Sequence, residues 1–138
     1  MRAKKDQTVL ITGASSGIGA AFAEVFAREG YALVLTAQNH VRLAVVAARL
    51  KDVYGSRVDI VARDLAEEGA AKALFEWVEQ QGIIIDILVN NAGLGSFGPF
   101  YQEDVDRERE MMMVNVIALT QLTRYILPGM IARHSGKI

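Results

Sequence analysis

The sequence contains no cysteine, which excludes disulfides, thiolate metal sites and cysteine nucleophiles. Its only two histidines, His40 and His134, stand far apart and no carboxylates cluster with them, so no metal site is expected. An excess of one charge is also lacking, because 15 basic and 16 acidic residues leave a net charge of −1. Nucleic-acid binding is therefore not expected, since it needs a surplus of cations to neutralise phosphates.

Long hydrophobic runs are missing as well. The longest stretch without a charged residue is 7–23, and glycine, serine and threonine interrupt it, so no membrane span is expected. The basic N-terminus is followed by only three apolar residues before Thr12, too few for an export signal. These absences predict a cytoplasmic protein. Hydrophobic residues nevertheless make up 51% of the 138 residues, which suits one folded domain over 1–138.

Short apolar runs alternate with helical patterns along the chain. The alternation predicts an α/β fold in which helices cover both faces of a parallel sheet. In the first helix, we expect the large apolar side chains to face the sheet. The fourth helix is apolar nearly all round from Met111 to Thr123, a pattern typical of a helix covered on more than one side. A chain this short has little left to cover it, so we expect its methionines at 111–113 and its apolar flank to be exposed. The predicted strands are 9–11, 32–35, 58–61 and 84–89, and the predicted helices are 17–28, 41–54, 67–81 and 103–133.

A glycine-rich turn joins the first predicted strand to the first helix, with the sequence Thr-Gly-Ala-Ser-Ser-Gly-Ile-Gly at 12–19. Glycines at such a turn let backbone N–H groups approach a phosphate, and the helix N-terminus favours its negative charge. The spacing differs from the G-x-G-x-x-G of most dinucleotide sites. The turn predicts a site for a dinucleotide pyrophosphate, and a tight turn without a ligand is the alternative.

This turn resembles the cofactor motif of the short-chain dehydrogenase/reductase family, and further family motifs follow in the family's order. Asp64-Leu65 follows the third strand, Asn90-Asn91-Ala92-Gly93 closes the fourth, and Asn115 lies in the fourth helix. The segment 135–138 resembles the family's approach to its fifth strand. The resemblance implies a Rossmann-like doubly wound parallel sheet of order 3-2-1-4, truncated at the start of strand 5, as a single incomplete dinucleotide-binding domain.

The resemblance also assigns roles to residues. Asp64 would accept a hydrogen bond from the adenine amine, with Leu65 beside the ring, and Asn90 would brace the sheet. Asn115 is the one catalytic residue implied: it would distort its helix and hold a water in a proton relay. Asn91, Ala92 and Gly93 would line the cofactor cleft through their backbone. The pyrophosphate and adenosine ribose would be bound by Gly13, Ser15, Ser16, Gly17, Ile18 and Gly19.

The choice between NADP and NAD depends on the end of the second strand. Dinucleotide sites that bind NAD place an acid there for the ribose 2′-OH, but this chain has Ala37 and no acid between Tyr31 and Lys51. NADP is therefore favoured, with NAD as the alternative. Gln38 stands where family members that prefer NADP often carry arginine, so Arg42 and Ser15 are the expected contacts to a 2′-phosphate.

The family's catalytic tyrosine and lysine, spaced Tyr-x-x-x-Lys, are absent, as is the serine upstream of them. The residues four places after the four tyrosines are Leu35, Val58, Val105 and Gly129. Of the family's catalytic set, only Asn115 is present.

Three interpretations follow. The chain is the cofactor-binding N-terminal part of an NAD(P)-dependent oxidoreductase, which moves hydride between nicotinamide and a small-molecule carbonyl or alcohol. Alternatively, it is a non-catalytic nucleotide-binding fragment or pseudoenzyme that acts through oligomer contacts, or a split protein completed by another chain. A homo-oligomer is expected through the fourth helix or through the edge of the fourth strand, which would otherwise lack a partner.

Overall fold

The computed structural model describes residues 3–138, which form a four-stranded parallel sheet of order β3-β2-β1-β4. The apolar runs form these strands because both faces of the sheet are covered, so side chains that point to either face are buried. The predicted strand order is therefore confirmed. The strands are β1 (Thr8–Thr12), β2 (Ala32–Ala37), β3 (Val58–Ala62) and β4 (Ile85–Val89).

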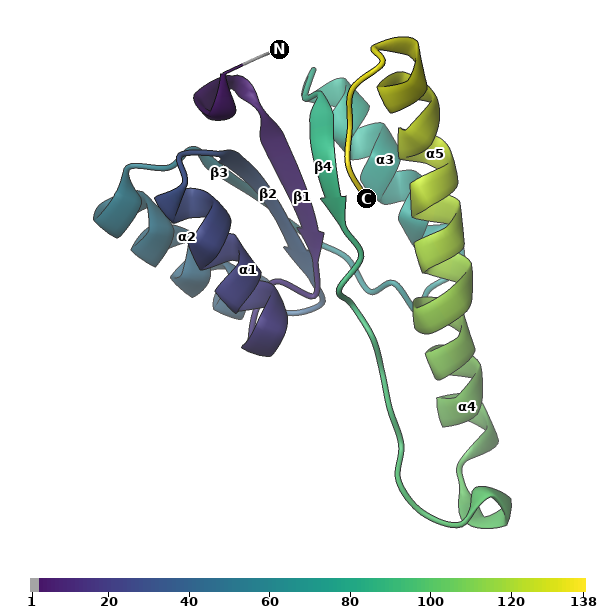
Figure 1. The fold of residues 1–138 in the computed structure, drawn as a ribbon. Helices are drawn as coiled ribbons and strands as arrows, with labels where there is room; N and C mark the ends of the chain where they lie inside the picture. The colour runs from purple at the N-terminus through teal and green to yellow at the C-terminus, as the bar shows by residue number, and fades with distance from the viewer. Residues whose placement is uncertain (1–2) are drawn as a thin grey trace.

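Helices lie on both faces of the sheet, as Figure 1 shows. Helices α1 (Gly17–Arg28) and α2 (His40–Tyr54) cover one face, and α3 (Ala70–Gln80) and α5 (Leu119–Ala132) cover the other. Strand β1 contributes side chains to the cores on both faces of the sheet, because successive side chains point to opposite faces. Val9 and Ile11 belong to the cluster beneath α1 and α2, and Leu10 belongs to the cluster beneath α3 and α5.

The face that α1 turns to the sheet is not the one predicted. Its buried residues are small, namely Gly19, Ala23 and Ala27. Ile18, Phe22 and Val25 are exposed, and Phe26 is half-buried against Tyr31. The physical reason is that a helix entering directly from a tight turn lies close to the sheet, where only small side chains fit.

One long helix runs beside the sheet and is drawn in green and yellow in Figure 1. It consists of α4 (Val105–Met112), a π-helical segment η3 (Met113–Ala118) and α5. It begins at Val105 rather than at 103 because Asp104 caps it, its Oδ1 accepting from the backbone N–H of Asp106 at 2.8 Å. Asn115 lies inside the π segment, which agrees with the predicted helix distortion.

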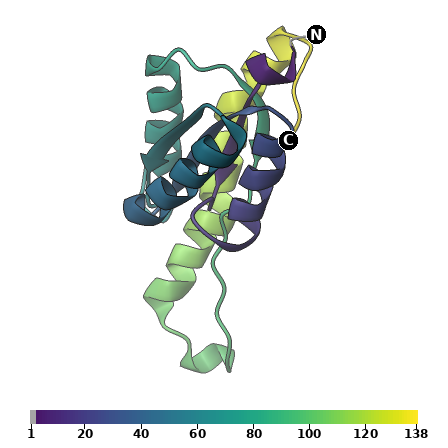
Figure 2. The same cartoon turned by 90° about the vertical axis from the view of Figure 1, so that its left-hand side faces the viewer.

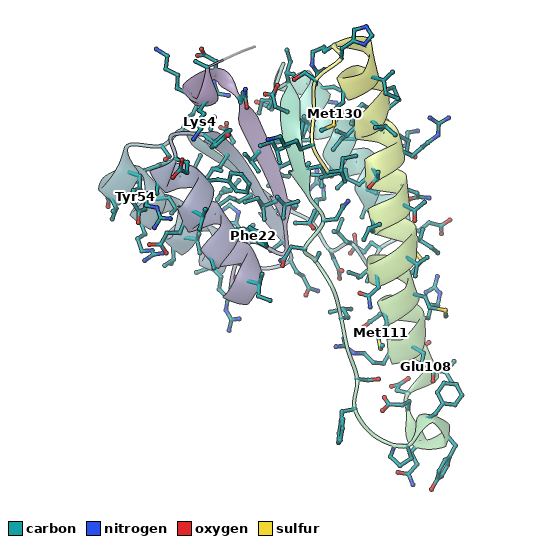
Figure 3. The ribbon with its side chains drawn as sticks, in the orientation of Figure 1. Lys4, Phe22, Tyr54, Glu108, Met111 and Met130 are labelled. Carbon is teal, nitrogen blue, oxygen red and sulfur yellow. The ribbon has the colours of Figure 1, made fainter. Side chains whose placement is uncertain are left out.

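This helix buries one face only, and the predicted exposure of its apolar flank is confirmed. The buried positions recur every fourth residue, as Val114, Ala118, Leu122, Ile126 and Met130. Met130 points toward β4 and the C-terminal segment (Figure 3). The opposite side exposes apolar side chains because no described residue packs on it. Exposed there are Met112, Val116, Ile117, Leu119, Leu127 and Ile131.

The C-terminal residues lie along β4 and occupy part of its outer edge (Figure 1). The amide of Lys137 donates to the carbonyl of Asp86 at 3.1 Å, and the carbonyl of Lys137 accepts from the amide of Leu88 at 3.0 Å. This parallel bridge matches the expected start of a fifth strand.

The start of α3 and two short 3-10 turns complete the description of the fold. Helix α3 starts at Ala70 rather than at 67, because Gly69 adopts a left-handed conformation (φ 77°) just before it. Short 3-10 turns occur at η1 (Lys4–Asp6) and at η2 (Phe100–Gln102), which lies at the far end of the segment that projects beyond the sheet with α4 (Figure 2).

Among residues 3–138, no helix combines the length and apolar character of a membrane span. The cytoplasmic location stays a prediction.

A polar cluster joins α1 to α2 and makes the fold sensitive to pH. Glu24 accepts hydrogen bonds from the Arg49 guanidinium and from the Tyr54 hydroxyl, the latter at 2.9 Å. The Arg49 bond, followed by the Tyr54 bond, lowers the pKa of Glu24 below its ordinary 4.5. The bond to Glu24 in turn raises the pKa of Tyr54 above its ordinary 10.0.

Glu24→Gln is expected to flatten the acid limb of the stability profile. A depressed carboxyl pKa stabilises the fold above pH 4.5, and that stability is lost as pH falls through the lower folded pKa. The raised Tyr54 pKa acts oppositely, so its contribution is lost as pH rises above 10.0. Urea midpoints measured across both limbs check this, with Glu68→Gln, an exposed acid outside the cluster, as the control. Identical acid limbs in the wild type and Glu24→Gln would contradict it.

Candidate functional site

A hollow of about 560 Å³ opens at the carboxyl edge of the sheet, between the β1–α1 turn and the start of the long helix. Ligands of open parallel sheets bind at this edge, outside the carboxyl ends of the strands. The structure brings eleven of the fifteen predicted site residues to its wall. They are Gly13, Ser15, Ser16, Ile18, Ala37, Gln38, Asp64, Leu65, Asn91, Ala92 and Gly93.

Close packing requires glycine at two positions of the β1–α1 turn, Gly13 and Gly19. Gly13 has φ +65°, and a β-carbon there would lie 2.9 Å from Nδ2 of Asn91. A β-carbon on Gly19 would overlap the carbonyl oxygen of Gly13 and lie 2.5 Å from the same Asn91 nitrogen. Gly19 therefore lies beneath the turn rather than on the wall of the hollow, and Gly17 is also not part of the wall. Their part is to let the turn lie flat, with its backbone open to a ligand.

Thr12 joins the ends of β1 and β4, and sequence reasoning did not identify it. Its buried hydroxyl accepts from the amides of Asn91 (3.1 Å) and Ala92 (2.9 Å) and donates to the carbonyl of Val89 at 3.4 Å. The two partners of this contact lie some eighty positions apart in the chain, so only the strand order reveals it. The hydroxyl fixes the loop after β4 against the glycine turn.

The side chains of Asn90 and Asn91 also hold this loop. Asn91 Nδ2 donates to the carbonyls of Thr12 (3.0 Å) and Gly13 (3.2 Å), so the amide supports the turn from below. Asn90 Nδ2 donates to the Thr123 hydroxyl at 2.9 Å and ties the end of β4 to α5. Asn90 thus braces the sheet against a helix.

Asp64 stands after β3 with both carboxylate oxygens engaged. Oδ2 accepts from Nε2 of Gln38 at 2.8 Å, and Oδ1 accepts from the amide of Ala66 at 2.9 Å. The first bond crosses from the end of β3 to the end of β2. Each oxygen retains a lone pair, so the carboxylate can still accept a bond from a ligand in the hollow.

Asn115 lies just outside the wall and positions a residue that is part of it. Its Oδ1 accepts from the amide of Leu94 and its Nδ2 donates to the carbonyl of Leu94, both at 2.8 Å. An asparagine is suited to this place because its amide offers a donor and an acceptor side by side. The side chain therefore fixes the segment after Gly93 against the π segment.

Replacing Asn115 by alanine is expected to release that segment. The loss of two hydrogen bonds at a partly solvated site predicts a destabilisation of about 1–2 kcal/mol. Hydrogen exchange at Leu94 should accelerate by mass spectrometry or NMR. Asn115→Asp keeps the acceptor for the Leu94 amide but loses the donor, so its exchange should be intermediate. Unchanged exchange at Leu94 in the alanine variant would contradict this account.

Arg42 is not brought into the site. It is exposed on α2, where its backbone amide donates to the Asn39 side chain, and it does not line the hollow. Other residues line the hollow that the sequence reasoning missed, because none belongs to a motif at a known spacing. They are Arg63, Ala66, Leu94, Arg107, Glu110 and Val114.

A family model for short chain dehydrogenases matches residues 7–138. Among curated relatives, a short chain dehydrogenase of Pseudocercospora fijiensis is 38% identical over 134 residues, covering 96% of this chain and 43% of the relative. The NADP-dependent 3-hydroxy acid dehydrogenase YdfG of Salmonella typhi is 34% identical over 131 residues, covering 94% of this chain and 51% of the relative. The chain thus spans about half the length of these relatives.

Solved structures give the same result for the fold. A short-chain dehydrogenase from Sphingobium yanoikuyae in complex with NADPH superposes with a TM-score of 0.88 at 41% identity, covering 94% of this chain and 50% of the other. L-Sorbose reductase from Gluconobacter frateurii, complexed with NADPH and L-sorbose, gives 0.86 at 41% identity, covering 94% and 49%. Sequence and fold agree with the motifs along the hollow, and the chain belongs to the short chain dehydrogenase family.

Proposed function

We propose that this chain is the NADP(H)-binding part of an oxidoreductase that moves hydride between nicotinamide and a small-molecule carbonyl or alcohol. The observation that carries the proposal is the hollow at the carboxyl edge of the sheet. It combines an open glycine turn, an acceptor at Asp64 and no acid at the end of β2.

The residues present fit a dinucleotide. The glycine turn offers backbone amides at the N-terminus of α1, where a pyrophosphate is favoured by the helix dipole. Asp64 would accept a bond from the adenine amine, and Leu65 would lie beside the ring. Ser15 and Ser16 would contact the phosphates and ribose. The dinucleotide supplies the nicotinamide that carries hydride, and this chain supplies binding and orientation.

NADP is favoured over NAD by the end of β2. Ala37 and Gln38 line the hollow where an acid would otherwise repel a 2′-phosphate. Support also comes from relatives whose names or structures include NADP or NADPH, among them the 3-hydroxy acid dehydrogenase, the short-chain dehydrogenase of Sphingobium yanoikuyae and L-sorbose reductase described above.

Asn115 is the member of the catalytic set that this chain would contribute. Its side chain holds Leu94 and it lies in the π segment, where it would hold a water of the proton relay. No tyrosine here is followed by lysine four places on. The 138-residue chain alone is therefore expected to bind dinucleotide without turning over a carbonyl substrate.

A second candidate function is a non-catalytic nucleotide-binding protein that acts through oligomer contacts. The exposed apolar side of the long helix favours it. Apolar surface of this kind often marks a protein interface, and β4 has an outer edge that only Lys137 occupies among the described residues. Either candidate requires the same nucleotide site.

Titration of the chain with NADPH and NADH by calorimetry tests the proposal. NADPH should bind about tenfold more tightly, the value of one added charge-assisted contact. Tighter NADH binding would overturn the NADP assignment, and no binding of either would overturn the nucleotide site. A reproducible carbonyl reductase activity of the pure chain would contradict the expected lack of turnover.

A further inference from the structure

We propose that Arg63, at the end of β3, supplies the cation that recognises the 2′-phosphate of NADP. This inference rests on the proposed function and names the residue that sets its cofactor preference. It replaces the expectation that a basic residue after β2 would do so. Three features of Arg63 carry it: its position, its unused donors and the absence of a competing ion pair.

The position of Arg63 is fixed by the sheet. Ala37 pairs with Ala62 in the β2–β3 register, and the amide of Arg63 donates to the carbonyl of Ala37 at 3.0 Å. Arg63 is thus held beside Gln38, where the ribose of a dinucleotide is recognised. It lines the main hollow and also a smaller adjoining one of about 350 Å³, which it shares with Gln38 and Asp64.

Most donors of Arg63 remain free for a ligand. Nη1 donates to the carbonyl of Ala62 at 3.0 Å, and Nε is shielded from solvent without a hydrogen-bond partner in the structure. A guanidinium has five N–H donors in a planar fork that matches phosphate oxygens. The remaining N–H groups on Nη1 and Nη2 make no hydrogen bond to the described residues, so they can donate to phosphate oxygens.

Neighbouring carboxylates do not neutralise Arg63. Within residues 3–138, the guanidinium forms no ion pair. The oxygens of Asp64 already accept from Gln38 and from the amide of Ala66. Glu67 lines the smaller hollow but is exposed at its rim, where its charge opposes a phosphate and is screened by salt. Among the residues that line the smaller hollow, Arg63 is the one cation, and it forms an ion pair with neither Asp64 nor Glu67.

The test compares 2′,5′-ADP with 5′-AMP, which differ only in the 2′-phosphate, by calorimetry on the 138-residue chain. The wild type should prefer 2′,5′-ADP. Arg63→Ala should weaken binding of 2′,5′-ADP by about 10- to 100-fold, the range for a charged hydrogen bond, and leave binding of 5′-AMP nearly unchanged. Arg63→Lys keeps the charge without the fork and should lose less. Arg57→Ala, an exposed arginine before β3, is the matched control.

The outcomes separate this inference from the proposed function. If the wild type binds neither ligand, the nucleotide site itself is wrong. If it prefers 2′,5′-ADP and Arg63→Ala keeps that preference, or if Arg42→Ala removes it instead, Arg63 is not the cation and the site stands. An equal loss of both ligands in Arg63→Ala would also overturn the inference. Glu67→Gln, which leaves Arg63 intact, should strengthen binding of 2′,5′-ADP at low salt and leave binding of the nucleotide without the 2′-phosphate unchanged. Unchanged binding of 2′,5′-ADP would contradict the inference.

Discussion

Gly19→Ala is expected to abolish dinucleotide binding and to destabilise the chain by about 3 kcal/mol, the upper range for overpacking a tight site. The new methyl group would overlap the carbonyl oxygen of Gly13 and crowd Asn91 Nδ2. The Gly13 carbonyl is part of the backbone, and the Asn91 side chain is held by two hydrogen bonds. Moving either group would therefore cost folding stability. Relief of the clash must therefore lift the glycine turn from its support and close the hollow.

Urea denaturation and NADPH titration check this prediction. Gly95→Ala is the matched control, since a β-carbon there meets nothing within 4 Å and its backbone conformation suits any residue. Gly17→Ala separates strain from crowding, because Gly17 also has open space but has φ +54°. It should cost about 1 kcal/mol and retain some binding. A Gly19→Ala variant as stable as Gly95→Ala would show that the turn is not packed as described.

The strands and the carboxyl-edge site were predictable because each depends on local signals, whereas the strand order came from the family resemblance. Apolar runs gave the strands, and the motif at 12–19 placed the hollow at the end of the first strand. Asp64, Asn91 and Asn115 were found for the same reason, since each belongs to a motif that follows a recognisable strand or helix. The structure places the first two on the wall and the third against Leu94.

What the sequence could not predict depends on distances between elements. The depth of α1 against the sheet decides that Ala23 rather than Phe22 is buried, and hydrophobicity alone ranks them the other way. Strand β3 pairs with β2, and this pairing brings Arg63 to the hollow, which Arg42 does not line. A sequence reading follows one strand and its loop, whereas the cation comes from the adjacent strand.

Which side of the long helix is buried also depends on how the elements pack against one another. Its sequence from Met111 to Thr123 is apolar nearly all round, and the described residues cover only the side that carries Val114 and Ala118. A homo-oligomer through the same surface remains our proposal, and it predicts that the mass in solution exceeds that of one chain.

Thr12→Val is expected to cost about 1–3 kcal/mol and to weaken dinucleotide binding strongly. Valine has the shape of threonine but no hydroxyl, so the amide of Ala92 loses its acceptor in a partly buried place, while the amide of Asn91 keeps its bond to the carbonyl of Val89 at 3.0 Å. An amide left without a partner costs about 1–3 kcal/mol. The loop after β4 would then separate from the glycine turn, and the hollow lies between these two segments.

Thr12→Ser is the control that isolates the hydroxyl, since it keeps the acceptor and loses only a methyl group, worth about 1 kcal/mol. Urea denaturation, NADPH titration and hydrogen exchange at residues 91–92 should all rank wild type, serine and valine in that order, with the large step at valine. If serine and valine instead lose equal stability, packing of the methyl group holds the loop. If valine keeps full binding, the side chain and backbone of Asn91 suffice to position the loop, and the hydroxyl of Thr12 has no part in forming the site.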